Sequence, residues 1–309
     1  MNALQFTAYG PPSVLEVAEL ADPHPGPGEI RVAVRASGVT PADGYLRSGR
    51  FRDSIALPLP HVPGVDAAGV VDEIGDGVTT AHLGDDVFGI VDPTRMGGAN
   101  AGYGVLVAWA SKPVAWTWEE AGGAAANVET ATRVLDRLDV DDGTTLLIEG
   151  AAGGVGTTAI QLAIARGATV IGTASAGNQD FLASLGALAT TYGPGLAGRV
   201  ATLCPDGVDA VLDCAGSGSL PDLVQLAPGP DRVVTIADMD AAAHGVHLSR
   251  SAGPGADAPA IGGLAIAGAL AAEGRFAVPV AAVFTLEEGA CAHELSEARH
   301  ARGKIVLTP

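Results

Sequence analysis

Short stretches in which apolar and polar residues alternate dominate the first third of the chain. Residues 4–8, 14–19, 29–37 and 65–74 are rich in β-branched side chains, and a Pro- and Gly-rich turn at 22–28 separates two of them. This pattern predicts short β-strands. Gly69 in the last of these stretches, and Gly64 just before it, suit the bends and bulges of a small barrel. We therefore expect a β-rich domain at the start of the chain.

The pattern changes in the middle of the chain. Residues 116–138 follow a helical period, in which Val128, Thr132 and Leu135 fall on one face. From residue 144 apolar strands alternate with helix-like segments. The predicted strands are 145–148, 168–173, 188–192, 210–214 and 232–236, and the first helix is 155–166. This alternation predicts an α/β fold with a parallel, doubly wound Rossmann sheet. A helix starting within 284–288 and a strand at 304–307 return to the opening style.

Charge narrows the classes of partner. The 309 residues include 35 acidic and 17 basic side chains, for a formal charge of −18. Such a surface repels phosphate backbones and anionic membranes, so neither nucleic acid nor a membrane is expected as a partner. Hydrophobic residues make up 48% of the chain, which is enough for sizeable cores. We expect the partner to be a small molecule.

Cysteine usage and the first residues bear on the compartment. Three scattered cysteines do not suit a disulfide framework, and no CxxC pair is present. The chain begins without a basic segment followed by a long apolar run, so no signal peptide is expected. The apolar stretch 260–272 is too short and too interrupted by glycine to span a bilayer. These features predict a cytoplasmic protein.

A glycine-rich loop carries the strongest motif. The segment 148–156 reads Ile-Glu-Gly-Ala-Ala-Gly-Gly-Val-Gly and lies between a predicted strand and a predicted helix. The spacing of Gly150, Gly153 and Gly156 allows a tight turn, a close approach to a pyrophosphate and close helix–strand packing. The helix start offers free N–H groups to phosphate. We expect the loop to bind a dinucleotide through Gly150, Ala152, Gly153, Gly154, Val155 and Gly156.

The end of the next strand bears on which dinucleotide binds. NAD sites carry Asp or Glu there, about 20 residues past the loop, to hold the ribose 2′-hydroxyl. This chain has Thr173 and Ser175 instead, and its first acid, Asp180, lies at the expected start of the following helix. The absence of a carboxylate favours NADP(H). No Arg or Lys lies between residues 166 and 199, so neutral hydrogen bonds from Thr173, Ser175, Asn178 and Tyr192 are the expected contacts.

With these motifs in place, the chain resembles the medium-chain dehydrogenase/reductase superfamily, in its zinc-independent quinone oxidoreductase and enoyl reductase branch. The resemblance extends over nearly the whole chain. Its landmarks are residues 30–43, 63–71, 84–89, the glycine loop, 184–187, 209–216 and 302–307.

The resemblance implies a split architecture. A β-rich, GroES-like catalytic domain would comprise residues 1–119 and 280–309, and a Rossmann domain would comprise residues 120–279. It implies an NADPH-dependent reductase that transfers hydride to a conjugated C=C bond, or to a quinone, in a homodimer. The alternative is a tailoring or structural protein of the same fold that binds cofactor but has lost or altered its redox activity.

The resemblance also implies roles for individual residues. Tyr45 aligns with a substrate-side polar position and is the preferred donor to the substrate carbonyl, unless it only packs on a short helix. Thr40 stands where relatives often carry Asn, and we assign both residues to catalysis. Glu129 is unusual for the family, and is either a solvated helix residue or a carboxylate beside the cofactor. Further cofactor contacts are implied for Thr130, Cys214, Ala215, Ile236, Ala237 and Lys304.

Zinc alcohol dehydrogenases of the same superfamily are the rival class. Thr40 occupies the place of their cysteine ligand, and Gly64-Val65-Asp66 stands where they have Gly-His-Glu. The four-cysteine structural lobe is missing. Zinc requires three or four nitrogen, sulfur or carboxylate ligands, so no metal site is expected. His244, His247 and His293 are interpreted as ordinary surface or packing residues.

Overall fold

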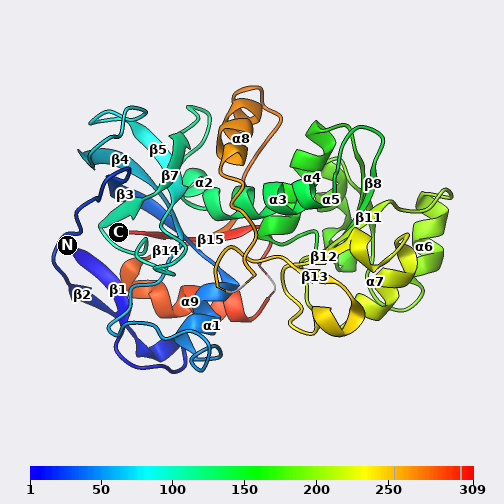
Figure 1. Ribbon diagram of the computed structural model, residues 1–309, viewed down its shortest axis with the longest axis horizontal. Helices are drawn as coiled ribbons and strands as arrows, with labels where there is room; N and C mark the ends of the chain where they lie inside the picture. The colour runs from blue at the N-terminus through cyan, green and yellow to red at the C-terminus, as the bar shows by residue number, and fades with distance from the viewer. Residues whose placement is uncertain (254, 300) are drawn as a thin grey trace. The chain divides into compact units, whose positions relative to one another are not determined.

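The computed structural model describes residues 1–253, 255–299 and 301–309 (Figure 1). Its contacts divide the chain into two compact units. Unit 1 comprises Met1–Ala126 and Ile261–Pro309, and unit 2 comprises Asn127–Ala260. The predicted boundaries near 120 and 280 differ from this division mainly at the second crossing. The reason is helix α8 (Gly262–Ala272), which packs on strand β7 of unit 1.

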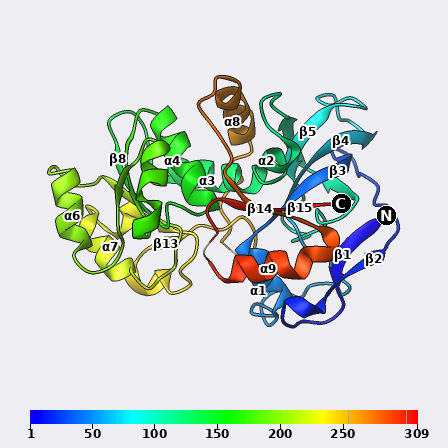
Figure 2. The same cartoon turned by 180° about the vertical axis from the view of Figure 1, so that it is seen from behind.

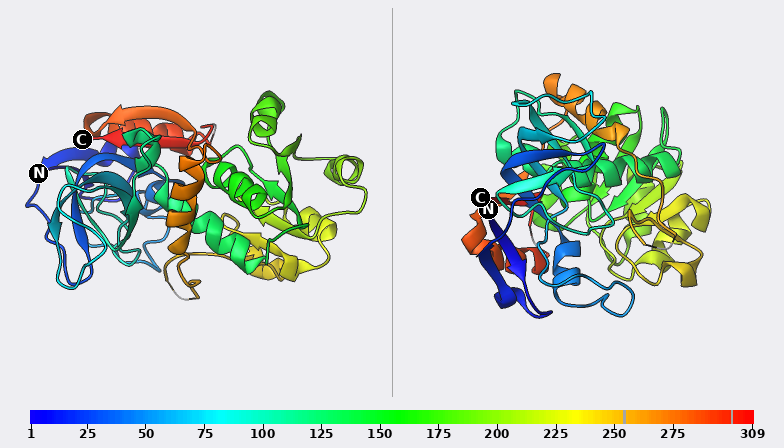
Figure 3. Two further views of the ribbon diagram at one scale, coloured as in Figure 1. Left: turned by 90° about the horizontal axis from the view of Figure 1, so that it is seen from above. Right: turned by 60° about the vertical axis from the view of Figure 1, so that its left-hand side comes forward.

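Unit 1 is built on a seven-stranded sheet. The order along the sheet is β14-β15-β3-β4-β5-β7, and β6 also pairs with β3. In Figures 1 and 3 the red C-terminal strand β15 lies beside the blue β3, an antiparallel pairing that joins the two ends of the chain. The strands are β3 (Ile30–Val39), β4 (Asp66–Ile74), β5 (Asp86–Ile90), β6 (Tyr103–Leu106), β7 (Ala108–Ser111), β14 (Val280–Thr285) and β15 (Lys304–Thr308). A separate antiparallel pair consists of β1 (Asn2–Phe6) and β2 (Leu15–Glu19).

Apolar residues of β3, β4 and β5 form one core of unit 1, and β15 and α9 contribute to a second. Two register shifts interrupt the β3–β4 pairing, as expected of bulged strands. The helices are α1 (Pro41–Arg47), α2 (Trp118–Gly122), α8 and α9 (Gly289–Glu297), with short 3-10 turns at Pro12–Val14 and Leu286–Glu288. The predicted helix start at Phe284 is therefore early by two residues, because Phe284 and Thr285 pair with β15 and the 3-10 turn begins at Leu286.

Unit 2 contains a six-stranded parallel sheet of order β10-β9-β8-β11-β12-β13. Numbered along the unit, this is the Rossmann order 3-2-1-4-5-6. The strands are β8 (Thr145–Glu149), β9 (Thr169–Thr173), β10 (Leu188–Thr190), β11 (Ala210–Asp213), β12 (Val233–Thr235) and β13 (His247–Leu248). The five predicted strands all form, each within two residues of its expected ends. The predicted doubly wound α/β fold is thereby confirmed.

Helices cover both faces of this sheet. On one face, Leu147 and Val211 pack with α6 and α7 in a single apolar core. On the other, Leu182 of α5 lies against Gly172. The helices of the unit are α4 (Gly154–Ala165), α5 (Gln179–Ser184), α6 (Leu196–Leu203) and α7 (Leu220–Leu226), with 3-10 turns at Ala176–Asn178, Pro230–Arg232 and Ala241–His244. Helix α3 (Ala125–Arg137) begins at the boundary between the units, and Val128, Thr132 and Leu135, which were predicted to share one face, are all buried.

Candidate functional site

The glycine loop connects β8 to α4 with the geometry that its spacing predicts. Gly150 adopts φ +74°, a conformation that favours glycine. At Gly156 a Cβ atom would lie 2.6 Å from the Gly150 carbonyl oxygen and 2.7 Å from the Ala151 Cα. Only a glycine lets the first turn of α4 approach the strand end this closely. The loop therefore holds the helix start against the carboxyl end of β8.

The first backbone N–H groups of α4 have no hydrogen-bond partner within the helix. Gly153 is its N-cap and accepts from the Thr157 N–H at 2.9 Å. The N–H groups of Gly154, Val155 and Gly156 precede the first residue with an i−4 partner inside the helix. Gly153, Gly154 and Val155 are only half-buried, together with Ala152. Free donors and the positive end of the helix dipole suit a pyrophosphate, so the loop fits a dinucleotide.

The end of β9 lies next to the loop, since the Ala151 N–H donates to the Thr173 carbonyl at 3.0 Å. Thr173 is fully buried, and within the described residues its hydroxyl has no hydrogen-bond partner. Ser175 is exposed and caps a 3-10 turn without using its side chain. Asp180 sits in the first turn of α5, as expected. This strand end therefore offers hydroxyl groups and no carboxylate.

The remaining residues predicted for this end of the cofactor surround the same strands. Asn178 is half-buried at the start of α5, and Tyr192, which follows β10, is 56% exposed. Arg199 of α6 donates to the carbonyls of Thr191 and Pro194, at 2.8 Å each. The guanidinium that lies nearest Tyr192 in the sequence is thus already engaged with backbone oxygens.

A hydrogen-bonded network fixes the tips of β11 and β12. The buried Asp213 carboxylate accepts from the Ala215 N–H at 2.8 Å and from the Thr235 hydroxyl at 2.7 Å. Thr235 in turn accepts from the Ala237 N–H at 3.1 Å. Both tips lie at the carboxyl edge of the sheet, where open α/β sheets bind ligands. Cys214, Ala215, Ile236 and Ala237 are all half-buried there.

Cys214 and Glu149 at this edge both have raised pKa values. Burial raises the pKa of the Cys214 thiol well above its ordinary value, and the nearby Asp213 and Glu149 carboxylates act in the same direction. Glu149 is buried and accepts hydroxyl hydrogen bonds from Ser217 and Ser219, each at 2.8 Å. Burial also raises the pKa of Glu149, against those hydrogen bonds. The sequence interpretation missed Glu149, although its place directly before the glycine loop was a signal.

Glu129 belongs to a buried ion pair, which corrects the interpretation of it as a solvated helix residue. It is 3% exposed, and its carboxylate accepts from the Arg133 Nε at 2.8 Å, one helical turn further along α3. Arg133 also donates to Ser249, and Ser249 donates to Asp257 at 2.6 Å. The Thr130 hydroxyl lies 3.4 Å from Glu129. A polar network thus ties α3 to the segment that follows β13.

The same network involves His247. Its Nε2 lies 2.9 Å from an Asp257 oxygen. Burial raises the pKa of the Asp257 carboxyl, but hydrogen bonds from Ser249 and His247 outweigh this, so that the pKa lies below its ordinary value. His247 therefore has a specific carboxylate partner in the fold, rather than being an ordinary surface side chain.

Thr40 and Tyr45, the predicted catalytic residues, lie at the start and in the middle of α1. The Thr40 hydroxyl and N–H both donate to the same oxygen of Asp43, at 2.7 Å each. The other Asp43 oxygen accepts from the Gly64 N–H at 2.9 Å. Thr40 is thus held as a cap of the helix. The Tyr45 hydroxyl oxygen accepts from Arg299 at 2.7 Å, which leaves the hydroxyl proton free to be donated.

Lys304, predicted to contact the cofactor, is buried in the sheet of unit 1 beside Asp66. The Nζ of Lys304 lies 3.7 Å from an Asp66 oxygen, and the two residues are 4% and 0% exposed. The same oxygen accepts from the Ala126 N–H at 3.1 Å. Burial raises the pKa of Asp66, and the Lys304 charge acts against this. The structure gives Lys304 a carboxylate partner that the sequence did not indicate.

A second buried cluster joins α1 to α9, which lie side by side in Figures 1 and 2. Arg47 is fully buried and donates to Glu297 and to the Gly10 carbonyl. His293 is 1% exposed, and its Nδ1 lies 3.4 Å from the Arg47 Nε. Burial lowers the pKa of His293 to about 4. The expectation of a packing histidine is confirmed, although His293 faces inward from its helix.

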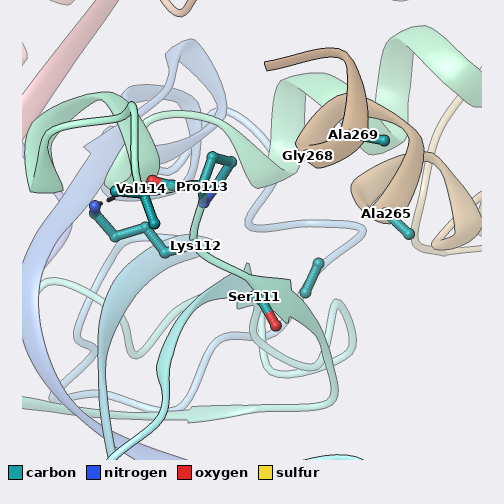
Figure 4. Close-up of a pocket in the computed structure, with 8 residues that line it drawn as sticks. Ser111, Lys112, Pro113, Val114, Ala265, Gly268 and Ala269 are labelled. Atoms are coloured by element: carbon teal, nitrogen blue, oxygen red, sulfur yellow. Dashed lines mark hydrogen bonds between the residues drawn. The ribbon is translucent and has the colours of Figure 1, made fainter. Parts of the chain in front are cut away.

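A groove of about 410 Å³ lies between the segment after β7 and α8 (Figure 4). Ser111 and Lys112 line one wall, and Ala265, Gly268 and Ala269 line the other. None of the residues predicted to contact cofactor or substrate borders it. Across residues 1–253, 255–299 and 301–309, no group of three or more His, Cys, Asp or Glu side chains could hold a metal ion. No helix in the same ranges is long and apolar enough to cross a membrane.

Two family models match separate stretches of the chain. Residues 26–131 match the alcohol dehydrogenase GroES-like domain, and residues 195–307 match a model described as zinc-binding dehydrogenase. A solved structure titled as an NAD-dependent alcohol dehydrogenase is 30% identical, covers all of both chains and has a TM-score of 0.84. The chain therefore belongs to the medium-chain dehydrogenase/reductase superfamily, and its similarity to quinone oxidoreductases supports the branch expected from the sequence.

Two further relatives make the comparison more specific. The Escherichia coli quinone oxidoreductase, solved in complex with NADPH, is 25% identical over the full length of both chains, with a TM-score of 0.83. The 2-methylene-furan-3-one reductase of Solanum lycopersicum is 33% identical over 230 residues, which are 71% of this chain and 58% of that protein. The chain thus spans little more than half the length of this curated relative.

Proposed function

We propose that the protein is an NADPH-dependent reductase that delivers hydride to a conjugated carbon–carbon double bond or to a quinone. The observation that carries this proposal is the glycine loop, which presents the free donors of α4 at the switch point of a Rossmann sheet whose next strand ends without a carboxylate. The tomato and Escherichia coli relatives, by their names, reduce a conjugated ketone and a quinone. They support the same chemistry here.

The chain's own residues would position the reactants. The N–H groups of Gly154, Val155 and Gly156 would hold the pyrophosphate, and Thr173 and Ser175 would contact the adenosine ribose. When bound, the nicotinamide supplies the hydride. Negative charge then collects on the substrate's carbonyl oxygen, and a hydroxyl aimed at that oxygen stabilises it. The Tyr45 hydroxyl is free to donate this hydrogen bond, whereas the Thr40 hydroxyl already donates a hydrogen bond to Asp43.

The family resemblance also supports a homodimer in the cytoplasm, with a small enone or quinone as substrate. In this arrangement pairing would use the edge of the unit 2 sheet, where β13 is the terminal strand. Sedimentation velocity of the purified chain tests the dimer.

Cofactor choice is testable at the end of β9. The wild type is expected to bind NADPH more tightly than NADH, because no carboxylate near Ser175 repels a 2′-phosphate. Ser175→Asp adds that repulsion and an acceptor for the 2′-hydroxyl, so it should narrow or reverse the preference. Isothermal titration with both cofactors measures the two affinities, and Ser184→Asp, on the far end of α5, is the matched control. Equal affinities in the wild type contradict the NADPH assignment.

The reaction itself is tested by isotope transfer. The protein is incubated with nicotinamide-deuterated NADPH and a simple enone such as 3-penten-2-one, and the product is examined by NMR. We expect deuterium at the β-carbon of the saturated ketone. Deuterium on a carbinol carbon would mean carbonyl reduction and would overturn the proposal. Tight NADPH binding without turnover of any enone or quinone would support the alternative of a cofactor-binding protein that lacks redox activity.

A further inference from the structure

Two arginine side chains contact Tyr45 from distant parts of unit 1. Arg50 follows α1, and its guanidinium carbon lies 4.6 Å from the centroid of the Tyr45 ring. Arg299 follows α9 and donates from Nη2 to the Tyr45 hydroxyl oxygen at 2.7 Å. The ring of Phe51 packs edge-on against the same ring, with 6.0 Å between the two ring centroids. Two positive charges are thus gathered on one tyrosine, on the segments that continue α1 and α9.

The neighbouring arginines differ from these two in having carboxylate partners. Arg47 is paired with Glu297, and Arg52 lies 3.8 Å from Asp53. Over the described part of the chain, neither Arg50 nor Arg299 has a carboxylate within ion-pair distance. Acidic residues outnumber basic ones by two to one in this sequence, 35 against 17. A pair of guanidinium groups without acidic partners is therefore a local reversal of the overall charge.

Both contacts leave hydrogen-bond donors available. A guanidinium that stacks on an aromatic face keeps its N–H groups at the rim, and Arg299 uses one of its five donors on Tyr45. The planar fork of arginine matches the paired oxygens of a carboxylate or phosphate. The phenol proton of Tyr45 is left for the substrate carbonyl, as proposed above. These donors together suit an anion with two or three oxygens.

We propose that Arg50 and Arg299, which both contact Tyr45, bind an anionic group of the substrate, and that they select conjugated carbonyl compounds that carry a carboxylate or phosphate over neutral ones. This inference rests on the proposed reductase function and names its substrate class. The anion is carried either by the reacting molecule itself, as a carboxylate close to the enone, or by an attached carrier, as a phosphate.

Paired substrates test the selection. trans-4-Oxo-2-pentenoate and its methyl ester differ in the charge and one methyl group, and crotonyl-coenzyme A differs from crotonyl-pantetheine by the phosphates and adenosine of the carrier. We expect the charged member of one pair to be reduced with at least tenfold higher kcat/KM. Arg50→Gln and Arg299→Gln should each lower the ratio of charged to neutral kcat/KM about tenfold, the effect of losing one charged hydrogen bond to the anion. Increasing salt should reduce the difference.

Arg275→Gln is the matched control, because Arg275 is an exposed arginine of unit 1 that is paired with Glu273. It should change neither member of a pair. If both arginine variants leave the ratio of charged to neutral substrate as in the wild type, the proposal is overturned. The pair that shows the preference identifies the source of the anion.

A binding measurement separates this inference from the reductase proposal. 4-Oxopentanoate and butanoyl-coenzyme A are the saturated products of the two charged substrates, and calorimetry in the presence of NADP⁺ measures their affinities without turnover. We expect the product of the preferred substrate to bind the wild type, and the Arg50→Gln/Arg299→Gln double variant to bind it at least tenfold more weakly. Binding that depends on the arginines in a protein that reduces no enone would refute only the reductase function. Equal affinities of the wild type and the double variant would refute the arginine site.

Discussion

Arg133→Ala is expected to lower the free energy of unfolding by about 3–5 kcal/mol, because it leaves the Glu129 carboxylate buried without its partner. The two side chains are each 4% exposed and lie 2.8 Å apart. Urea denaturation monitored by circular dichroism measures this difference in the free energy of unfolding. Arg137→Ala is the matched control on the same helix. Arg137 is 46% exposed and 3.9 Å from Asp257, so its loss should cost about 1 kcal/mol or less.

A variant that replaces both partners makes this prediction sharper. Replacing Arg133 by Met together with Glu129 by Leu removes both charges and keeps the volume filled. Because the cost of the single variant comes from an unpaired buried charge, the double variant should be more stable than Arg133→Ala. If Arg133→Ala proves no more harmful than Arg137→Ala, the buried pair does not stabilise unit 2.

Tyr45→Phe is expected to slow hydride transfer to an enone by roughly ten- to a thousandfold, the effect of losing one hydrogen bond to the developing oxyanion. NADPH affinity should not change, because the cofactor contacts proposed above come from unit 2. Single-turnover kinetics with excess enzyme measures the step directly. Phenylalanine keeps the ring that lies under Arg50 and meets Phe51 edge-on, so the change is confined to the hydroxyl.

Tyr9→Phe is the control for this variant. Tyr9 is a half-buried tyrosine of unit 1 whose ring packs near Phe6 at 6.3 Å, and loss of its hydroxyl should leave the rate as it is. A wild-type rate in Tyr45→Phe would remove Tyr45 from the reaction, and the water around the substrate would then have to supply the hydrogen bond. The binding role proposed for Arg50 and Arg299 would remain to be judged by the paired substrates.

The local elements of the fold could be predicted from the sequence because their signals are local. Three glycines between a strand and a helix identify the glycine loop in the sequence. In the structure Gly150 has a positive φ and Gly156 has no room for a Cβ atom, as their positions in the motif require. Strand β14 was missed. Its residues alternate between half-buried and exposed, and its last two residues, Phe284 and Thr285, fall within the segment predicted to start a helix.

The buried charged side chains could not be predicted, because their partners are distant in the sequence. Arg133 contacts Ser249, which is 116 residues away, and Arg47 contacts Glu297, which is 250 residues away. A charged residue taken alone is expected at the surface. The pairing of Asp66 with Lys304 is of the same kind, since strands β4 and β15 come from opposite ends of the chain.

The strand order of unit 1 also determines when its sheet can be completed during translation. β3 and β15 are neighbours in the sheet, yet all of unit 2 lies between them in the chain. Unit 2 comes from one uninterrupted stretch, so all its strands are available while β15 is still to be translated. At about 5–20 residues per second, residues 304–308 follow only seconds later. Until then the edge of β3 at Ser37, Gly38 and Val39 has no neighbour on that side. In a nascent chain stalled before residue 304, unit 2 would already be complete, but this edge of β3 would still be open to chaperones or to other chains.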